Sequence, residues 1–262
     1  MILITGGSAY NASKFLKNTK YNFLIPVHRS TPEVRNKNVF IFKDFNKLIN
    51  SEEFKHINFF VNFASSYNKN ISYIELFRSS ILFALKFLFK LDKKSLVLFI
   101  NIGSYSQDSN NVNKTKKKYV NIKNFSDRIF CLIVGKEKFI NLKIGDTYGE
   151  NDPRNKLNSV LNNHKNKSTL ILSGNKENIL YPVSIDEINN CLDYIISNYK
   201  LFNKMQITQV RAFGTKISLE EYIDKFKKSN NFEFDIVFES NDYNKECVKT
   251  GKSDFCFIIN NF

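Results

Sequence analysis

Short, uninterrupted runs of apolar residues constrain the fold of this chain more than any other feature. Six of them lie within residues 1–149: MILIT, NFLIPVHR, NVFIFKD, INFFVNFAS, SLVLFINIG and FINLKIGDTYG. Runs without polar alternation are typical of strands buried on both faces, as in parallel sheets. Segments with helical patterns lie between or beside them, near Ala12–Asn18, Asn46–Phe54, Ser72–Leu91 and Lys116–Val134. This alternation predicts a doubly wound α/β sheet.

The pattern changes beyond about residue 150. STLILSG and MQITQVRAFG predict strands, whereas VSIDEINNCLDYIISN and SLEEYIDKFKK predict helices. Ser218 and Glu221 have the spacing of a capping box at the start of the second helix. We therefore expect a Rossmann-type nucleotide-binding domain at 1–150 and a smaller substrate-binding lobe at 151–262. These boundaries are approximate, because the two lobes are expected to interleave.

Composition excludes several classes of protein. The formal net charge is +14, but the lysines are scattered, and nucleic-acid binding needs a clustered basic surface. The four cysteines form no CxxC pair, and the three histidines share no metal-ligand spacing. The longest apolar stretch, ISYIELFRSSILFALKFLFKL, is interrupted by four charges, which argues against a membrane crossing. We expect a cytoplasmic protein with free thiols, no metal, no membrane segment and no nucleic-acid partner.

The opening segment, MILITGGSAYNASKF, has the layout of a dinucleotide-binding turn. An apolar strand leads into Gly6 and Gly7, and a helical segment follows. Ala9 and Ala12 stand where the later glycines of such a turn are expected. Gly6 can still form the tight turn, and the amides that begin the helix can still meet a phosphate. The sequence leaves open whether the two extra methyl groups displace a cofactor or prevent its binding.

Two further features could carry chemistry. Tyr119 and Lys123 lie four residues apart and therefore on one face of a helix. An ammonium beside a phenol favours proton transfer from that phenol, which suits proton exchange with a carbonyl oxygen during hydride transfer. Ser104 follows a buried run, at the carboxyl end of a strand where open α/β sheets bind ligands. Each feature alone is weak evidence. Tyr10 and Lys14 have the same spacing as Tyr119 and Lys123, and a basic helix face in solvent would show the same pattern. A serine after a strand is also an ordinary turn residue.

Together, these segments resemble the extended short-chain dehydrogenase/reductases that act on nucleotide-linked sugars. ITGGSAYNAS is similar to the family's TGGxGFxG turn, VNFASSY to its fourth-strand cofactor segment, and GSYS and YVNIK to its catalytic Ser/Thr and YxxxK. NLKIGDTYGENDPR, VSIDEI and FGTKISLEEY follow in the family's order, so the resemblance runs from Met1 to about Lys227. Departures are Ser80 in place of a helix asparagine, a missing lobe arginine near Tyr181, and an early C-terminus.

The resemblance implies a set of site residues. Those implied for catalysis are Ser104, Tyr119 and Lys123, and those for substrate binding are Ser104, Tyr105 and Tyr148. Those implied for cofactor binding are Gly6, Ser8, Ala9, Tyr10, Asn11, Arg29, Ser30, Ala64, Ser65, Tyr119 and Lys123. Arg29 and Ser30 stand where NAD-dependent proteins carry an acidic residue, which favours NADP(H), with NAD(H) as the alternative. The resemblance also implies a nucleotide-diphosphate sugar as partner and a homodimer through the helices near 72–91 and 116–134.

Three functions stay open at this point. The first is NAD(P)H-dependent reduction of a nucleotide-linked 4-keto-6-deoxy sugar. The second is 4-epimerisation with retained NAD, against which Ala9 and Ala12 argue because that reaction needs a tightly held cofactor. The third is a catalytically silent protein that binds a dinucleotide or a partner. Asp108 and Asp127 flank the catalytic segment without the paired acid–glutamate arrangement of the family's dehydratases, so dehydration is disfavoured.

Overall fold

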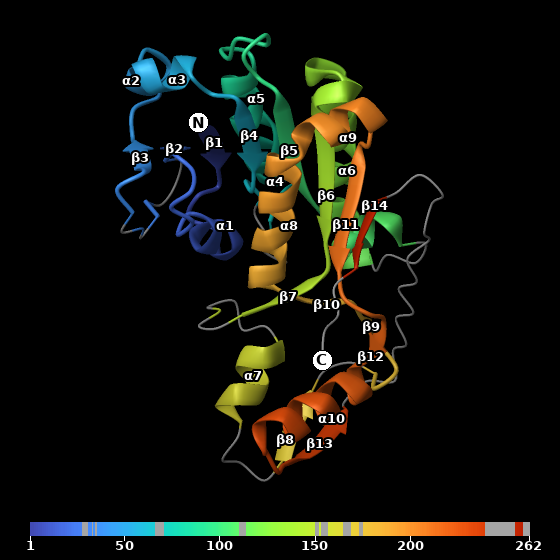
Figure 1. Ribbon diagram of the computed structural model, residues 1–262. Coiled ribbons are helices and arrows are strands. Elements are labelled where there is room, and N and C mark those ends of the chain that lie inside the picture. Colours follow the sequence, from blue (N-terminus) through green and yellow to red (C-terminus); the bar gives the residue numbers. More distant parts are fainter. Residues whose placement is uncertain are drawn as a thin grey trace.

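An eight-stranded parallel sheet forms the centre of the computed structural model (Figure 1). The structure describes residues 1–27, 31–32, 34, 36–65, 71–109, 114–149, 152, 157–164, 169–172, 175–238 and 255–258. The strands are β1 (Ile2–Thr5), β2 (Phe23–Pro26), β3 (Val39–Phe42), β4 (Phe59–Asn62), β5 (Leu98–Ser104), β6 (Phe139–Ile144), β11 (Gln209–Phe213) and β14 (Phe255–Ile258). Their order, β14-β11-β6-β5-β4-β1-β2-β3, contains the 3-2-1-4-5-6 arrangement of a Rossmann sheet. The predicted doubly wound α/β fold is confirmed.

The burial of the strands explains their continuous apolar sequences. β1 and β2 are buried at every residue, and β5 is buried except at Ser104. Helices cover both faces of these strands, so neither face can be polar. β3 lies at the edge of the sheet, where Phe40 and Ile41 are each 37% exposed.

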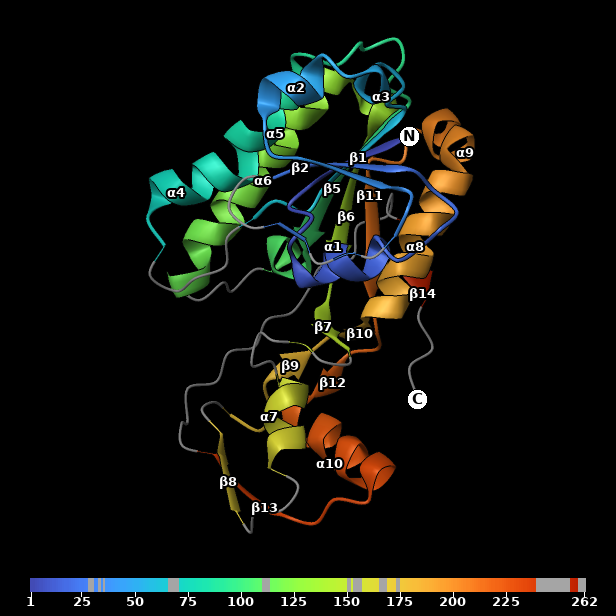
Figure 2. The ribbon, with the colours of Figure 1, turned by 90° about the vertical axis from the view of Figure 1, so that its left-hand side faces the viewer.

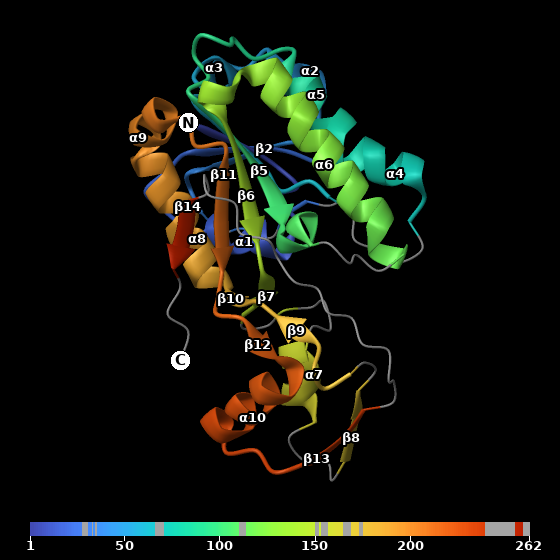
Figure 3. The same ribbon diagram turned by 90° about the vertical axis from the view of Figure 1, so that its right-hand side faces the viewer.

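Two layers of helices enclose the sheet (Figures 2 and 3). One layer contains α4 (Tyr73–Phe77), a π-helical turn η1 (Arg78–Leu82), α5 (Phe83–Leu88) and α6 (Lys114–Val134). The other contains α1 (Tyr10–Phe15), α8 (Ile185–Ser197) and α9 (Tyr199–Met205). The helix expected near 46–54 is divided into α2 (Phe45–Ile49) and α3 (Glu52–Lys55), because Ser51 accepts a hydrogen bond from the Phe54 amide and begins a new helix.

A smaller lobe lies beyond the carboxyl ends of the strands (Figure 1). It contains α7 (Leu157–Asn163), β8 (Thr169–Leu172), β9 (Ile179–Leu180), β12 (Ile217–Ser218), α10 (Leu219–Asn230) and β13 (Asp235–Phe238). β7 (Asp146–Tyr148) and β10 (Pro182–Ser184) pair where the two lobes meet. Between β10 and β12 the chain returns to the large sheet as α8, α9 and β11. The division expected near residue 150 stays a prediction.

Three sequence expectations concern membrane crossing, metal binding and the state of the cysteines. None of the helices in the described ranges is long and apolar enough to cross a membrane. Within the same ranges, no group of three His, Cys, Asp or Glu side chains could hold a metal ion. Cys131 and Cys191 are free thiols, and burial raises the pKa of Cys191 to about 12.

A row of polar side chains crosses the apolar interior of the sheet. Its members pair in register on five neighbouring strands: Thr5, Asn62, Asn101, Asn141 and Gln209. The Thr5 hydroxyl donates to Asn62 Oδ1 at 2.7 Å, and Asn62 Nδ2 donates to Asn101 Oδ1 at 2.9 Å. We call these five residues the polar row. It runs directly beneath the ends of the strands that position the site.

Candidate active site

The carboxyl ends of three neighbouring strands bring separate sequence segments to one edge of the sheet. Gly6 follows β1, Ala64 follows β4, and Ser104 is the last residue of β5. This edge faces the smaller lobe (Figure 3). In open α/β sheets, ligands bind at this edge, beside the point where the strand order reverses.

The first turn of the fold depends on Gly6. Its φ of +73° is rarely adopted by residues with a side chain. A Cβ at this position would lie 2.6 Å from the backbone nitrogen of Ala64, so the turns after β1 and β4 are in backbone contact. The Ala64 amide in turn donates to Asn62 Oδ1 at 3.1 Å. Gly6 therefore keeps the role expected of the first glycine in a dinucleotide-binding turn.

The two alanines of this turn fit the backbone that the structure adopts. Ala9 has φ −66° and ψ 143°, an ordinary extended conformation, and it is the N-cap of α1. Ala12 is completely buried in the core between α1, α8 and the sheet. Its methyl group therefore fills space between helix and sheet. Neither alanine removes the strand–turn–helix geometry of the motif.

The residues at the start of α1 fit a dinucleotide. Ala9 has no side chain that could accept a hydrogen bond from the first amides of α1. Asn11 Oδ1 is buried and has no hydrogen-bond donor among the described residues. A ribose hydroxyl or a similar ligand group could supply that donor. Ser8 is exposed beside this turn, and Tyr10 is half-buried.

A buried lysine connects α6 to the end of β5. Lys123 is 2% exposed, and its Nζ donates to the carbonyl oxygen of Ile102 at 2.7 Å. The same Nζ lies 5.8 Å from the centre of the Tyr119 ring. Burial lowers the pKa of Lys123 to about 8, and the nearby Asp127 carboxylate opposes this shift. The structure thus brings Lys123 to the strand end that carries Ser104, with Tyr119 one helical turn away.

Ser104 begins a short turn that is closed by its own neighbours. This turn is the 3₁₀ helix η2 (Tyr105–Asp108). Ser104 Oγ accepts from the Ser106 amide at 3.3 Å, and the Ser104 amide donates to Gln107 Oε1 at 2.9 Å. The two hydrogen bonds fix the backbone around the proposed catalytic hydroxyl.

The two tyrosines expected to bind substrate occupy different environments. Tyr148 lines a cavity of about 320 Å³ between α1 and the smaller lobe, and burial raises its pKa. Tyr10 lies across the same cavity. Tyr105 is 6% exposed, and its hydroxyl donates to Asp146 Oδ1 at 3.2 Å. Tyr148 therefore faces open space, whereas Tyr105 is packed where the two lobes meet.

Of the remaining residues expected to bind the cofactor, Ser65 lies among the described residues, and Arg29 and Ser30 do not. Ser65 is half-buried, and its Oγ lies 3.3 Å from Ser80 Oγ. Ser80, which stands in place of the expected asparagine, is 1% exposed in the π-helical turn. Arg29 and Ser30 lie outside the described residues. The NADP(H) preference inferred from them stays a prediction.

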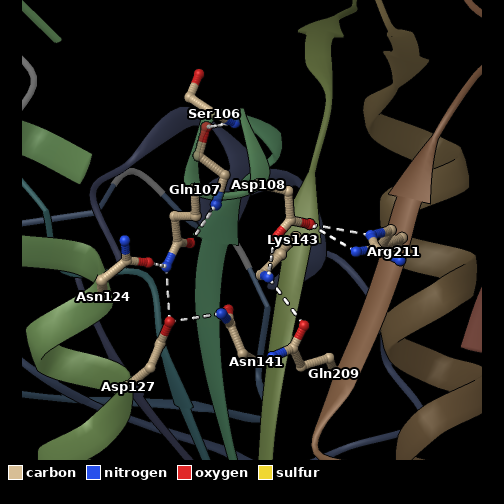
Figure 4. A network of polar contacts seen from close by, with 10 residues as sticks. Ser106, Gln107, Asp108, Asn124, Asp127, Asn141, Lys143, Gln209 and Arg211 are labelled. Carbon is tan, nitrogen blue, oxygen red and sulfur yellow. Dashed lines mark hydrogen bonds and ion pairs between the residues drawn. The ribbon is translucent and has the colours of Figure 1, made fainter. Parts of the chain in front are cut away.

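A hydrogen-bonded carboxylate behind the site was not anticipated. Asp127 accepts from Asn101 Nδ2 at 2.7 Å. It also accepts from Gln107 Nε2 and Asn141 Nδ2 at 2.6 Å each (Figure 4). The sequence singled out Asp127 only to argue against dehydration. A usable signal was present, because Asn62, Asn101 and Asn141 each interrupt an otherwise apolar strand run.

The fold recurs in solved structures of nucleotide-sugar epimerases and dehydratases. UDP-glucose 4-epimerase from Thermotoga maritima, solved with UDP-glucose, has a TM-score of 0.69 at 15% identity, covering 95% of this chain and 89% of its own. UDP-N-acetylglucosamine 4-epimerase from Methanobrevibacter ruminantium has a TM-score of 0.71 at 13% identity, covering 95% and 88%. dTDP-glucose 4,6-dehydratase from Streptomyces venezuelae, solved with NAD, has a TM-score of 0.68 at 11% identity, covering 97% and 87%.

Sequence comparison adds no closer relationship. No protein-family model matches the chain, and no curated protein matches it in sequence. The structural likeness therefore establishes the fold of the extended short-chain dehydrogenase/reductases. The resemblance expected from the sequence is confirmed at that level.

Proposed function

We propose that the protein is an NAD(P)-dependent oxidoreductase that reduces the keto group of a nucleotide-diphospho-4-keto-6-deoxy sugar. The observation that carries this proposal is the burial of Lys123 beneath Tyr119, at the strand end that bears Ser104. A buried ammonium opposes folding, and groups with strongly shifted pKa values concentrate at functional sites. Its position beside Tyr119, at the strand end that carries Ser104, suits proton transfer to a carbonyl oxygen.

The proposed chemistry divides among three side chains. A bound nicotinamide dinucleotide supplies the hydride that reaches the carbonyl carbon. The Ser104 hydroxyl donates a hydrogen bond to the carbonyl oxygen and orients it. The Tyr119 phenol transfers its proton to that oxygen, so the carbonyl becomes an alcohol. The Lys123 ammonium stabilises the negative charge left on the phenol oxygen and would bind the ribose of the dinucleotide.

Substrate recognition is assigned to the cavity beside Tyr148. It lies between the dinucleotide-binding turn and the smaller lobe, with Lys14 at its wall. The excess of basic residues favours a ligand that carries a diphosphate. Several solved structures with this fold hold UDP-sugars, which supports the same class of ligand.

A 4-epimerase with retained NAD is the second candidate. The sequence argued against it because Ala9 and Ala12 replace glycines. Ala9 has an ordinary backbone conformation and Ala12 fills the core, so that argument loses its force. The absorbance and fluorescence of the purified protein separate the two candidates, because an epimerase retains its dinucleotide and a reductase exchanges it at each turnover.

A homodimer through the helices near 72–91 and 116–134 is proposed from the surface of that layer. α4, α5 and α6 lie side by side there (Figure 2). Large apolar side chains are exposed along it: Ile74 at 63%, Phe89 at 66%, Phe125 at 48% and Leu132 at 85%. A hollow of about 550 Å³ between α4 and α6 is lined by Phe77 and Phe125. Exposed apolar surface of this kind is typical of an interface.

The catalytic assignment is tested by Tyr119→Phe. This change removes the phenol oxygen and keeps the ring, so we expect turnover of an accepted nucleotide-linked keto sugar to fall about 10²–10⁴-fold. Dinucleotide affinity, measured by fluorescence titration, should change little. Tyr194→Phe, on the exposed side of α8, is the matched control. Full activity of the Tyr119→Phe variant would refute the assignment.

A further inference from the structure

We propose that Asp127 is a positioning residue: its carboxylate sets the direction of the hydrogen bonds that hold Ser104 and stabilises the buried ammonium of Lys123. The proposal deepens the proposed function and rests on it. Asp127 lies on α6, one turn after Lys123. It is the point where the hydrogen bonds behind the active-site turn converge (Figure 4).

The carboxylate accepts three amide hydrogen bonds from three different segments. Asn101 on β5, Gln107 in η2 and Asn141 on β6 all turn their nitrogen atoms toward it. An ionised carboxylate can only accept, so each amide must present its NH₂ group. Burial raises the pKa of Asp127, while hydrogen bonds from Asn101 and Gln107 and the charges of Lys123 and Lys143 lower it. The donors therefore favour the charged form against desolvation.

The Gln107 side chain connects Asp127 to Ser104, and its hydrogen bond to Asp127 decides which end of its amide faces Ser104. Gln107 has a single amide with a nitrogen end and an oxygen end. Its Nε2 donates to Asp127 and to Asn124 Oδ1 at 3.0 Å, which places Oε1 where it accepts from the Ser104 amide. A reversed amide would direct an NH₂ group at the Ser104 N–H and leave both donors unsatisfied. Asp127 thus determines how the Ser104 backbone is held.

Asp127 also fixes amide orientations in the polar row, and through them the hydrogen bonds at the dinucleotide-binding turn. Because Asn101 gives its nitrogen to Asp127, its Oδ1 is left to accept from Asn62. Asn62 Oδ1 then accepts from the Thr5 hydroxyl and from the Ala64 amide. Ala64 is the residue whose backbone contacts Gly6. One carboxylate therefore orients hydrogen bonds at both the Ser104 turn and the dinucleotide-binding turn.

A second anchor holds the same turn without sharing these contacts. Asp108, at the end of η2, pairs with Lys143 on β6 and with Arg211 on β11, whose Nε donates at 3.0 Å. The Lys143 and Arg211 side chains are almost completely buried, and the Asp108 side chain is 13% exposed. This cluster ties η2 to β6 and β11. Asp108 thus fixes the position of η2 on the sheet, and Asp127 sets the direction of the hydrogen bonds that η2 makes.

The test compares two substitutions that divide the roles of Asp127. Asp127→Asn removes the charge and introduces an NH₂ group among three donors. Gln107→Met removes the side chain that connects Asp127 to Ser104, together with its hydrogen bond to Asn124, and leaves Asp127 with Asn101 and Asn141. Asp193→Asn is the matched control, because that half-exposed carboxylate pairs with Lys20 far from the site. All are read by amide hydrogen exchange and by the NMR titration of ¹³C-labelled lysine.

The proposal predicts a different pattern for each variant. In Asp127→Asn, the Ser104 amide should exchange about tenfold faster, the loss of one hydrogen bond, and Lys123 should titrate at a lower pH than in the unaltered protein. The charged and titratable groups beside Lys123 are Asp127, whose charge opposes the lowering of the Lys123 pKa, and Tyr119, whose ring centre lies 5.8 Å from Lys123 Nζ. In Gln107→Met, the exchange should accelerate equally while Lys123 is unchanged. The Asp193→Asn control should alter neither quantity.

Two results would overturn the proposal. One is unchanged Ser104 exchange and Lys123 titration in a folded Asp127→Asn protein. The other, which applies even if Asp127→Asn does not fold, is unchanged Ser104 exchange in Gln107→Met. The experiment also separates this proposal from the function it rests on. If both quantities move as expected but no nucleotide-linked sugar is turned over by the unaltered protein, the positioning role holds and the proposed substrate fails.

Discussion

Replacing Lys123 by methionine should stabilise the fold while disabling the site. Methionine keeps much of the apolar stem and removes the charge. Burial lowers the pKa of Lys123 from 10.5 to about 8, so the folded protein holds this proton less tightly than the unfolded chain does. That difference corresponds to about 3 kcal/mol by which the ammonium opposes folding at neutral pH. The lost hydrogen bond to Ile102 offsets about 2 kcal/mol of the gain, which leaves a net stabilisation of about 1 kcal/mol.

The pH dependence is the sharper part of this prediction. Between the folded and unfolded pKa values, about 8 and 10.5, the unfolded chain binds more protons, so the unaltered protein becomes more stable as pH rises. The Lys123→Met variant lacks this titration. Its advantage should therefore be largest below pH 8, reverse near about pH 9, and become a disadvantage of about 2 kcal/mol above about pH 10.5, where only the lost hydrogen bond counts.

Urea unfolding followed by circular dichroism measures these differences at several pH values. Lys118→Met, on the exposed face of the same helix, is the control and should show almost no pH-dependent difference. Turnover and dinucleotide affinity should both fall in Lys123→Met. A variant that is less stable by an amount independent of pH would show that Lys123 is simply a structural connection between α6 and β5.

Three further predictions concern the cofactor and the interface. Ala9→Gly should leave dinucleotide affinity almost unchanged and alter the free energy of unfolding by less than about 1 kcal/mol, because Ala9 already has the extended conformation of an N-cap and glycine is tolerated there; a severalfold change in affinity in calorimetry would contradict this. NADPH should bind more tightly than NADH, and Arg29→Ala should remove most of the difference; equal affinities in the unaltered protein would refute the preference. Phe125→Asp should shift a dimer toward monomer in sedimentation, whereas Ile171→Asp, equally exposed in the smaller lobe, should not.

The sequence predicted what local patterns determine and missed what depends on register. The continuous apolar runs predicted β1, β2, β4, β5 and β6, since burial on both faces is written in each strand separately. The Tyr119–Lys123 spacing predicted one helix face. Asn62, Asn101 and Asn141 are recognisable as polar interruptions of apolar runs, but their contacts with one another could not be predicted, because they become neighbours only once the strands pair.

Two other differences have equally physical causes. β13 and β14 were not expected, and each is completed by pairing with a strand distant in sequence, β8 and β11. The helix near 46–54 was expected to be continuous, but a serine inside it supplies a cap that competes with the helix interior. The sequence pattern alone does not decide whether Ser51 lies inside one helix or caps the start of a second helix.

The return of the chain to the large sheet has a consequence for folding during synthesis. β6 pairs with β5 as soon as both have emerged, but its other edge is covered only by β11. The segment between β6 and β11 in the sequence contains, among others, α7, β8, β10, α8 and α9, which are all synthesised before β11. An open strand edge can pair with another chain, and closing so long a loop is slow. The nascent protein therefore exposes the edge of β6 at least while residues 145–208 are synthesised, and chaperones that bind extended apolar segments should engage it there.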